Sequence, residues 1–369
     1  MLLHSIPHIK LSKPLFFSFI FLLTIGNPAG VHASDAGYSD SKKNGINGFR
    51  PTKLFVFGDS YSDTGNYRKI ESVSWKQPYG ITFPGKPSGR FSDGRVITDY
   101  IAEFLGVKSP TPFRWMNHAQ RRLQYGMNFA FGGTGVFDTF IPAGLNMTTQ
   151  IGFLQKLIDD SVYTNTDLHS SMALLTVCGN DYLDYLFRGR GTIEDLVPYT
   201  KKVVNQVATN MKRLHSMGVK KVSVTSMEPI GCLPGETANS SFRQCNDDNL
   251  NSVVMLHNSK LQKMVARLNS QTPDSPYFIL DLFSPFITII KQKKLPQEGS
   301  TRFETPLKPC CVGVSKGYDC ANVDQKGVKM YKICSDPNVA FFWDRSHPTQ
   351  AGWSAVYDSL KATLHDHLF

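Results

Sequence analysis

The stretch LFVFGDS, residues 54–60, is an apolar run that ends abruptly in a turn. Its bulky apolar side chains are typical of a buried strand. The Gly-Asp-Ser that follows can break the strand and hold the Ser60 hydroxyl at the edge of a sheet. The same residues are also ordinary turn formers, because glycine tolerates unusual backbone angles and Asp and Ser bond to nearby backbone. Ser60 is therefore a candidate nucleophile whose role depends on what the rest of the chain brings to it.

Short apolar runs alternate with helical patterns along the chain. The runs are typical of buried strands and lie at 53–57, 126–131, 172–177, 219–225, 277–283 and 339–343. Apolar residues three or four apart predict helices at about 97–105, 151–158, 203–214, 254–268 and 350–364. This alternation predicts an α/β protein with a central parallel sheet covered by helices on both faces.

We expect a single folded domain over residues 51–369. No internal repeat or linker divides it, and its loop insertions lie at about 71–95, 226–250 and 294–338. The polar residues 34–50 are predicted to form a flexible leader.

The first 33 residues have the pattern of a secretory signal peptide. Lys10 and Lys13 precede an apolar stretch at 15–23, and Ala33 ends a Val-His-Ala cleavage pattern. An uncleaved membrane anchor is the alternative, but the apolar stretch is short for a span of about 20 residues. No later segment is long and apolar enough for a transmembrane anchor, so we expect a secreted protein.

Composition narrows the class of protein. Of the 369 residues, 41% are hydrophobic and 19% charged, which predicts a packed core rather than disorder. The net charge of +10 could favour an acidic matrix or an anionic surface, although solubility is the simpler interpretation. No run of basic residues interleaved with aromatics supports nucleic-acid binding.

The seven cysteines fit an oxidising compartment. Cys232 and Cys245 bracket one loop and are candidates for a disulfide. The candidates in a second loop are Cys310, Cys311, Cys320 and Cys334. They could pair as 310–334 with 311–320, or as 310–320 with 311–334. Their spacing fits no common zinc pattern.

The remaining cysteine and two glycosylation sequons complete the short motifs. Cys178 ends an apolar run, and we interpret it as a buried thiol rather than a nucleophile. Sequons begin at Asn146 and Asn239, which we predict to be surface glycosylation sites if the chain is secreted.

Chemistry-bearing residues follow four of the predicted strands. They are Ser60, the glycine-rich segment at Gly132, the Gly-Asn-Asp segment with Asn180, and a final segment with Asp344 and His347. Parallel strands place their carboxyl ends at one edge, where ligands bind in such sheets.

Together these residues would suffice for acyl transfer. His347 is the candidate base for Ser60, and Asp344 would orient it. The backbone N–H groups of Ser60 and Gly132 and the side-chain amide of Asn180 would donate to an oxyanion. Taken singly, each could instead shape a turn or cap a helix.

The other acidic and histidine residues fit no catalytic or metal site. Asp59, Asp63 and Asp181 are interpreted as ligands of local backbone. The remaining histidines form no metal-binding set, so we predict no metal and no cofactor.

These segments resemble the plant-type GDSL esterases and lipases of the SGNH hydrolase superfamily. The similarity covers nearly all of residues 51–369. It includes FGDSYSDTGN at 57–66, GRFSDGR at 89–95, NFAFGG at 128–133, GCLP at 231–234 and PCC at 309–311. One departure is Tyr61, where the motif that names the family has leucine. Another is Phe131, at a position that is often small or polar in relatives.

The resemblance implies a flavodoxin-like three-layer α/β/α sandwich, the SGNH hydrolase fold. It implies Ser60 as nucleophile, His347 as base, Asp344 as its orienter, and Ser60, Gly132 and Asn180 as oxyanion donors. The expected function is a secreted serine esterase or lipase that hydrolyses carboxylic esters and takes part in lipid degradation. The expected substrates are small-molecule, lipid or cell-wall acyl esters, and the expected location is extracellular, in the apoplast or cell wall. An acyltransferase with the same residues and a non-catalytic binding protein are the alternatives.

Overall fold

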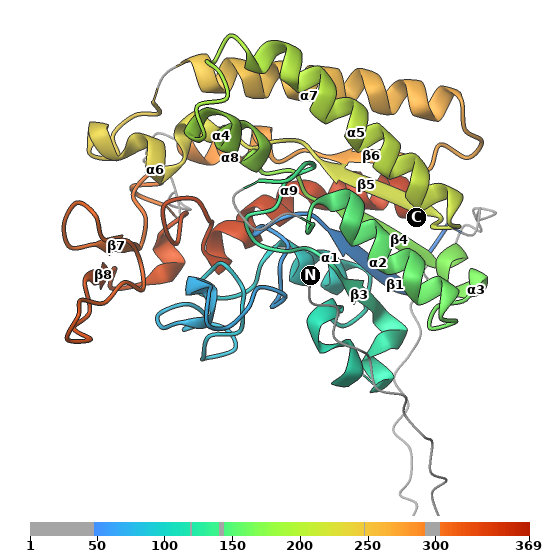
Figure 1. The fold of residues 1–369 in the computed structure, drawn as a ribbon, viewed down its shortest axis with the longest axis horizontal. Coiled ribbons are helices and arrows are strands. Elements are labelled where there is room, and N and C mark those ends of the chain that lie inside the picture. The colour runs from blue at the N-terminus through green and yellow to red at the C-terminus, as the bar shows by residue number, and fades with distance from the viewer. Residues whose placement is uncertain (1–47, 119, 140–143, 247, 292–302) are drawn as a thin grey trace, which may run out of the picture. The chain divides into compact units, whose positions relative to one another are not determined.

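The centre of the computed structural model is a parallel sheet (Figure 1). The structure describes residues 48–118, 120–139, 144–246, 248–291 and 303–369. In that part of the chain the sheet has six strands: β1 (Lys53–Phe57), β2 (Thr111–Pro112), β3 (Gly126–Asn128), β4 (Ser171–Leu175), β5 (Lys221–Thr225) and β6 (Tyr277–Leu280). Their order is β2-β3-β1-β4-β5-β6, and every neighbouring pair is parallel.

The strand order confirms the predicted fold class. Without the two-residue edge strand β2, the order is β3-β1-β4-β5-β6. If these five strands are numbered along the chain, the order is 2-1-3-4-5, which is the flavodoxin-like order. The direction of winding reverses between β1 and β4. In such sheets this switch point, at the carboxyl ends of the strands, is where ligands bind.

Two groups of helices cover the sheet. One group packs together and comprises α2 (Met147–Asp159), α5 (Leu196–Ser216) and α7 (Asp248–Ser270); α5 and α7 run side by side in Figure 1. In the other group, α1 (Ile97–Phe104) and α8 (Phe283–Lys291) both contact α9 (Gln350–Leu368). All residues of β4 are buried, as the prediction of a sheet covered on both faces requires.

Shorter helices occupy the connections. The α-helical ones are α3 (Asn165–His169), α4 (Asn180–Phe187) and α6 (Pro234–Thr237). The 3₁₀ helices are Val73–Trp75, Phe113–His118, Gln120–Tyr125, Ile230–Cys232, Ala238–Ser240 and Pro337–Val339. The five predicted helices are confirmed, whereas α3, α4, α6 and α8 were not predicted. The strand predicted over 277–283 ends at Leu280, because α8 begins at Phe283.

The prediction of a strand at 339–343 was wrong. This segment joins no strand of the central sheet, because its backbone pairs with a cysteine-rich loop instead. The N–H groups of Cys310 and Cys311 donate to the carbonyls of Phe342 and Trp343, over 2.9 and 2.7 Å. The apolar character that suggested a strand reflects burial of Phe342 and Trp343 outside the sheet.

Disulfides hold two of the predicted insertions. Cys232 pairs with Cys245, Cys310 with Cys334, and Cys311 with Cys320, which selects the first of the two pairings left open by the sequence. The second loop also contains the antiparallel strands β7 (Cys311–Gly313) and β8 (Tyr331–Ile333).

The amino-terminal assignments lie mostly outside the described residues. The signal peptide at 1–33 and nearly all of the leader at 34–50 fall within residues 1–47, and the domain assignment over 51–369 stays a prediction. Within the described part of the chain, no helix combines the length and apolar character needed to cross a bilayer.

Candidate active site

Ser60 lies in the turn that follows β1. Gly58 begins this turn with φ of +129°, and a Cβ there would lie 2.2 Å from Thr176 Oγ1, so the position requires glycine. The Asp59 carboxylate accepts hydrogen bonds from the N–H groups of Tyr61 and Cys178, over 3.1 and 2.8 Å. The turn is thereby tied to the segment that follows the neighbouring strand β4.

The turn is also held from the helix side by Gln150 of α2. Gln150 Oε1 accepts from the Gly58 N–H at 2.7 Å, and its Nε2 donates to the Gly58 carbonyl at 2.9 Å. Sequence reasoning did not find this residue, because its position within an amphipathic helix gives no sign that it reaches the turn.

Ser60, His347 and Asp344 form a hydrogen-bonded chain. Ser60 Oγ lies 2.8 Å from His347 Nε2, and His347 Nδ1 lies 2.8 and 2.9 Å from the two carboxylate oxygens of Asp344. With the proton on Nδ1, the imidazole donates to Asp344 and its Nε2 can accept the Ser60 proton. The residues expected to act together thus meet although 287 positions separate Ser60 from His347.

Asp344 is a buried carboxylate with several donors. Burial alone would raise its pKa, but the interaction with His347 and the surrounding hydrogen bonds outweigh it and hold the pKa of Asp344 below its ordinary value. The donors include the N–H groups of Ser346 and His347, each at 2.9 Å, and the Tyr79 hydroxyl at 2.6 Å. Asp344 therefore stays ionised and fixes the orientation of His347.

Tyr79 is a second residue that sequence reasoning missed. It lies in the 71–95 insertion, 265 positions from Asp344, and its side chain is 2% exposed. No rule of sequence spacing predicts a contact between two loops so far apart. The one available signal was that a tyrosine lies in an insertion that follows the Ser60 turn.

The segment carrying Asp344 and His347 is a tight turn. The Trp343 N–H donates to the His347 carbonyl at 2.7 Å, and the Thr349 N–H donates to the Phe341 carbonyl at 2.9 Å. This local pairing brings Asp344 and His347 together without a strand of the central sheet. The disulfide-bonded loop supports the same segment from its other side.

The three expected oxyanion donors differ in how free they are. The Ser60 N–H has no acceptor among the residues that the structure describes. Asn180 Nδ2 donates to the Thr134 carbonyl at 2.8 Å, which leaves the second hydrogen of its NH₂ group available. The Gly132 N–H donates to Asp63 Oδ2 at 3.0 Å, so its donation to an oxyanion stays a prediction.

Aromatic rings lie beside Gly132 and His347. A Cβ on Gly132 would lie 2.4 Å from the Phe91 ring, whose centroid is 5.1 Å from that of His347. Tyr67 packs against Phe131 with ring centroids 4.7 Å apart. Phe131 also lines a mostly apolar cavity of about 280 Å³, together with Phe113, Phe129, Leu145 and Phe153.

Asp59 and Asp63 accept from N–H groups of their own loop, as predicted, whereas the donors to Asp181 are not local but belong to Val136 and Phe137. Asp63 accepts from Gly132 and from three residues of its own loop, and Asp181 accepts from two N–H groups at 2.9 Å. Burial raises the pKa of Asp63 and of Asp181 to about 6, although these hydrogen bonds oppose the rise.

The remaining candidates have structural environments. Cys178 is a buried free thiol, as predicted, and burial followed by the nearby Asp59 charge raises its pKa well above the ordinary value. Asn146 caps α2 by accepting from the Thr149 N–H, and Asn239 is exposed on a 3₁₀ helix. Their glycosylation stays a prediction.

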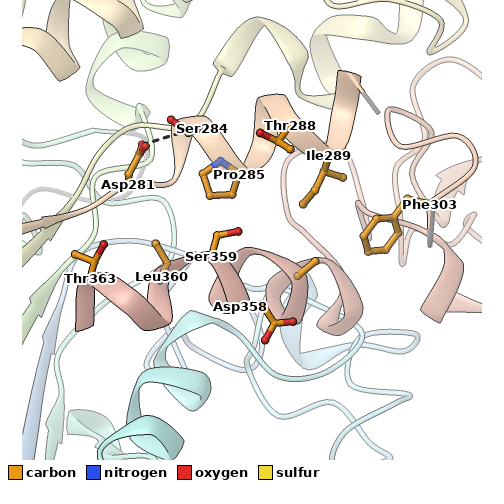
Figure 2. Close-up of a pocket in the computed structure, with 11 residues that line it drawn as sticks. Asp281, Ser284, Pro285, Thr288, Ile289, Phe303, Asp358, Ser359, Leu360 and Thr363 are labelled. Carbon is orange, nitrogen blue, oxygen red and sulfur yellow. Dashed lines mark hydrogen bonds between the residues drawn. The ribbon is translucent and has the colours of Figure 1, made fainter. Parts of the chain in front are cut away.

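A separate cavity of about 600 Å³ lies between α8 and α9 (Figure 2). Its lining includes Pro285 and Thr288 from α8 and Ser359 and Thr363 from α9. None of the residues that line it belongs to the hydrogen-bonded chain from Ser60 to Asp344, so this cavity is not where Ser60 would react.

Known proteins match this chain over nearly its full length. The family model described as GDSL-like Lipase/Acylhydrolase matches residues 54–360. Two Arabidopsis thaliana proteins, each named a GDSL esterase/lipase, are 52% and 49% identical to the chain; the alignments cover 96% and 99% of this chain and 98% of each relative. A solved lipase from a goat rumen metagenome is 11% identical, with a TM-score of 0.37 over 84% of this chain and 96% of its own.

Proposed function

Because this chain belongs to the GDSL-like lipase/acylhydrolase family, whose members act as carboxylic ester hydrolases, we propose that it cleaves esters through an acyl-enzyme on Ser60. The observation that carries the proposal is the 2.8 Å contact between Ser60 Oγ and His347 Nε2. This contact aligns a hydroxyl with a base that Asp344 holds in the required tautomer.

The proposed reaction has two halves. Ser60 Oγ attacks the ester carbonyl while His347 Nε2 takes its proton, and the imidazolium then gives that proton to the departing alkoxide. In the second half, His347 takes a proton from water, and the hydroxide formed attacks the acyl-enzyme. The proton then returns to Ser60 Oγ as the carboxylic acid leaves. Two N–H groups, from Ser60 and Asn180, are free to stabilise the oxyanion of each tetrahedral intermediate.

Substitution of Ser60 tests this mechanism directly. We expect Ser60→Ala to abolish hydrolysis of p-nitrophenyl esters and labelling by a fluorophosphonate probe, with an unchanged unfolding temperature. Ser359→Ala is the matched control, because Ser359 is exposed on α9 and lines the cavity between α8 and α9. An active Ser60→Ala variant would rule the mechanism out, and failure of the folded wild-type protein to label would favour a binding protein.

Assays with a series of esters would identify the class of substrate. We propose a lipid or other acyl ester as substrate, supported by the apolar Phe91 ring that lies beside both Gly132 and His347. Esters of graded acyl chain length, assayed with and without an alcohol acceptor, would give the chain-length preference. The same assay separates hydrolysis from acyl transfer, because transfer yields a new ester instead of the free acid.

We also propose that the protein is secreted. Three disulfides support passage through an oxidising compartment. Expression of the full chain in plant cells, followed by sequencing of the amino terminus, should find Ser34 first in protein recovered outside the cell. Retention of an uncleaved chain in membranes would contradict the proposal. A mobility shift after deglycosylation would show whether Asn146 or Asn239 carries a glycan.

A further inference from the structure

Tyr61 links the turn of Ser60 to the turn of His347. Its side chain is 2% exposed, and its hydroxyl donates to the Ser346 carbonyl at 3.0 Å. Its ring lies edge-on to Trp353, with centroids 5.0 Å apart, and 6.0 Å from the His347 ring. A leucine at this position would offer no hydroxyl, so the link depends on the residue by which this chain departs from the usual motif.

The carbonyls of the two residues between Asp344 and His347 are both held from outside the turn. The Gly235 N–H donates to the Arg345 carbonyl at 2.8 Å, and Tyr61 holds the Ser346 carbonyl. The Ser346 carbonyl belongs to the same peptide group as the His347 N–H. Its orientation is therefore coupled to the backbone that carries the imidazole.

Glu228 lies buried near Tyr61, in the loop after β5. Its side chain is fully buried, and neither carboxyl oxygen makes a hydrogen bond of normal geometry with a described residue; the donors that act on it are its own backbone N–H and the Tyr61 hydroxyl. A buried carboxylate without partners is strongly disfavoured. Burial accordingly raises the pKa of Glu228 to about 8; the Glu228 backbone N–H opposes the rise, the Asp59 charge adds to it, and Tyr61 opposes it.

Few titratable groups act on Glu228 and Tyr61. Asp59, in the turn after β1, raises the pKa of both, and Cys178, after β4, adds to the effect on Tyr61. The pKa of Tyr61 is raised well above its ordinary value, chiefly by burial, and the pKa of Cys178 is raised likewise. At neutral pH the cluster therefore has neutral tyrosine, cysteine and glutamic acid beside one aspartate whose pKa is also raised.

We propose that Tyr61 and Glu228 are a positioning pair for His347. In this arrangement the neutral Glu228 carboxyl donates to the Tyr61 oxygen, and the Tyr61 hydroxyl donates to the Ser346 carbonyl. Neither residue touches the substrate. When Glu228 ionises, its carboxylate competes with the Ser346 carbonyl for the Tyr61 proton and loosens the turn of His347. The inference rests on the proposed role of Ser60 and His347.

Removal of the Tyr61 hydroxyl is the first test. We expect Tyr61→Phe to lower kcat about 5- to 15-fold, the effect of one lost hydrogen bond, with KM changed less than about 2-fold. Tyr163→Phe is the matched control, because the Tyr163 hydroxyl also donates to a backbone carbonyl, that of Leu123 at 3.2 Å. Equal kcat for Tyr61→Phe and wild type, or an equal loss in Tyr163→Phe, would overturn the proposal.

Replacement of Glu228 by a side chain that cannot ionise is the second test. Glu228→Gln keeps a donor, so we expect kcat at pH 7 within about 2-fold of wild type and no fall near pH 8. The wild-type kcat should fall there as Glu228 ionises. The double variant Tyr61→Phe/Glu228→Gln should lose no more than Tyr61→Phe alone. If kcat falls identically above pH 7 in wild type and Glu228→Gln, the proposal of a positioning pair is overturned.

The two levels of inference fail in different ways. If Ser60→Ala stays active, or folded wild-type protein is not labelled by the fluorophosphonate, the proposed function fails. If wild type hydrolyses esters and labels on Ser60, while both test variants match it in kcat and pH profile, only the positioning pair fails.

Discussion

The Tyr79 hydroxyl donates a 2.6 Å hydrogen bond to Asp344 Oδ2, so a residue of the 71–95 insertion helps to hold the carboxylate that orients His347. Burial of Tyr79 keeps water away from this bond, and its ring packs edge-on to Trp343, with centroids 5.9 Å apart. The insertion therefore contributes a hydrogen bond to the site and is not only a surface loop.

Tyr79→Phe should lower kcat/KM about 10- to 100-fold, because it removes one hydrogen bond to a charged acceptor and keeps the packing. It should also raise the pKa of Asp344. Since that pKa is depressed, the stability it contributes is present above the ordinary value of 3.8 and is lost as pH falls through the folded-state value. The stability difference from wild type, measured by urea unfolding, should thus be present at pH 7 and shrink as the pH falls below 3.8. A difference independent of pH would assign Tyr79 a packing role alone.

Asp344→Asn should retain more activity than His347→Ala, although both should lose several orders of magnitude in kcat. The asparagine side chain would leave the base in place but would no longer fix its tautomer, whereas the alanine variant has no base. Single-turnover ester hydrolysis measures both residual rates. If Asp344→Asn loses as much as His347→Ala, Asp344 holds the turn as well as the imidazole.

Asp63→Asn should affect both the stability and the catalytic rate. The Asp63 carboxylate receives four backbone N–H groups, and an asparagine would present a donor to some of them. We expect unfolding to become easier by about 1–3 kcal/mol and kcat to fall, because the Gly132 peptide shifts. Urea unfolding and ester kinetics measure the two effects. Lost stability with unchanged kcat would remove Gly132 from the oxyanion site.

Cys310→Ser/Cys334→Ser should destabilise the protein by about 3–4 kcal/mol, as expected for a bond that closes a loop across a sequence separation of 24. Activity should be lost at lower urea concentration than Trp fluorescence, because Cys310 and Cys311 support the backbone immediately before Asp344. In wild type the two transitions should coincide. Coincident transitions in the variant would show that the loop does not support the site separately from the fold.

The sequence predicts the half of the site that sits on the sheet. The apolar run before Ser60 and the one before Asn180 are β1 and β4, and their carboxyl ends flank the switch point. Parallel pairing then brings the two residues to one edge without knowledge of any other contact. Local turn logic also gave the bond from the Tyr61 N–H to Asp59, since Asp at a turn bonds to nearby N–H groups, but it missed that Asp181 binds the distant N–H groups of Val136 and Phe137.

The other half depends on contacts that no local pattern encodes. Trp343 looks like part of a strand because it is apolar, but its carbonyl pairs with Cys311 in a loop that lies well before it in the sequence. Tyr79 and Tyr61 reach the His347 turn across long sequence separations through single hydroxyl groups. Hydrophobic periodicity reports burial and says nothing of which buried hydroxyl meets which acceptor.

The buried Glu228 predicts an unusual dependence of stability on pH. Its pKa is raised to about 8 in the folded protein from an ordinary value of 4.5, so between these values the folded state binds more protons than the unfolded chain. The free energy of unfolding contributed by this group must therefore fall as pH rises through that window and level off above it. Buried His257 acts in the opposite direction at lower pH, because burial lowers its pKa to about 3 from 6.5.

Comparison with Glu228→Gln isolates the single group, since both proteins share His257 and every other titrating side chain. The stability of wild type relative to Glu228→Gln should decrease steadily from about pH 4.5 to pH 8 and change little above. Urea unfolding at pH 5, 6, 7, 8 and 9 measures this difference. A constant difference across the series would mean that Glu228 ionises normally in the folded protein, and the neutral carboxyl beside Tyr61 would then have no support.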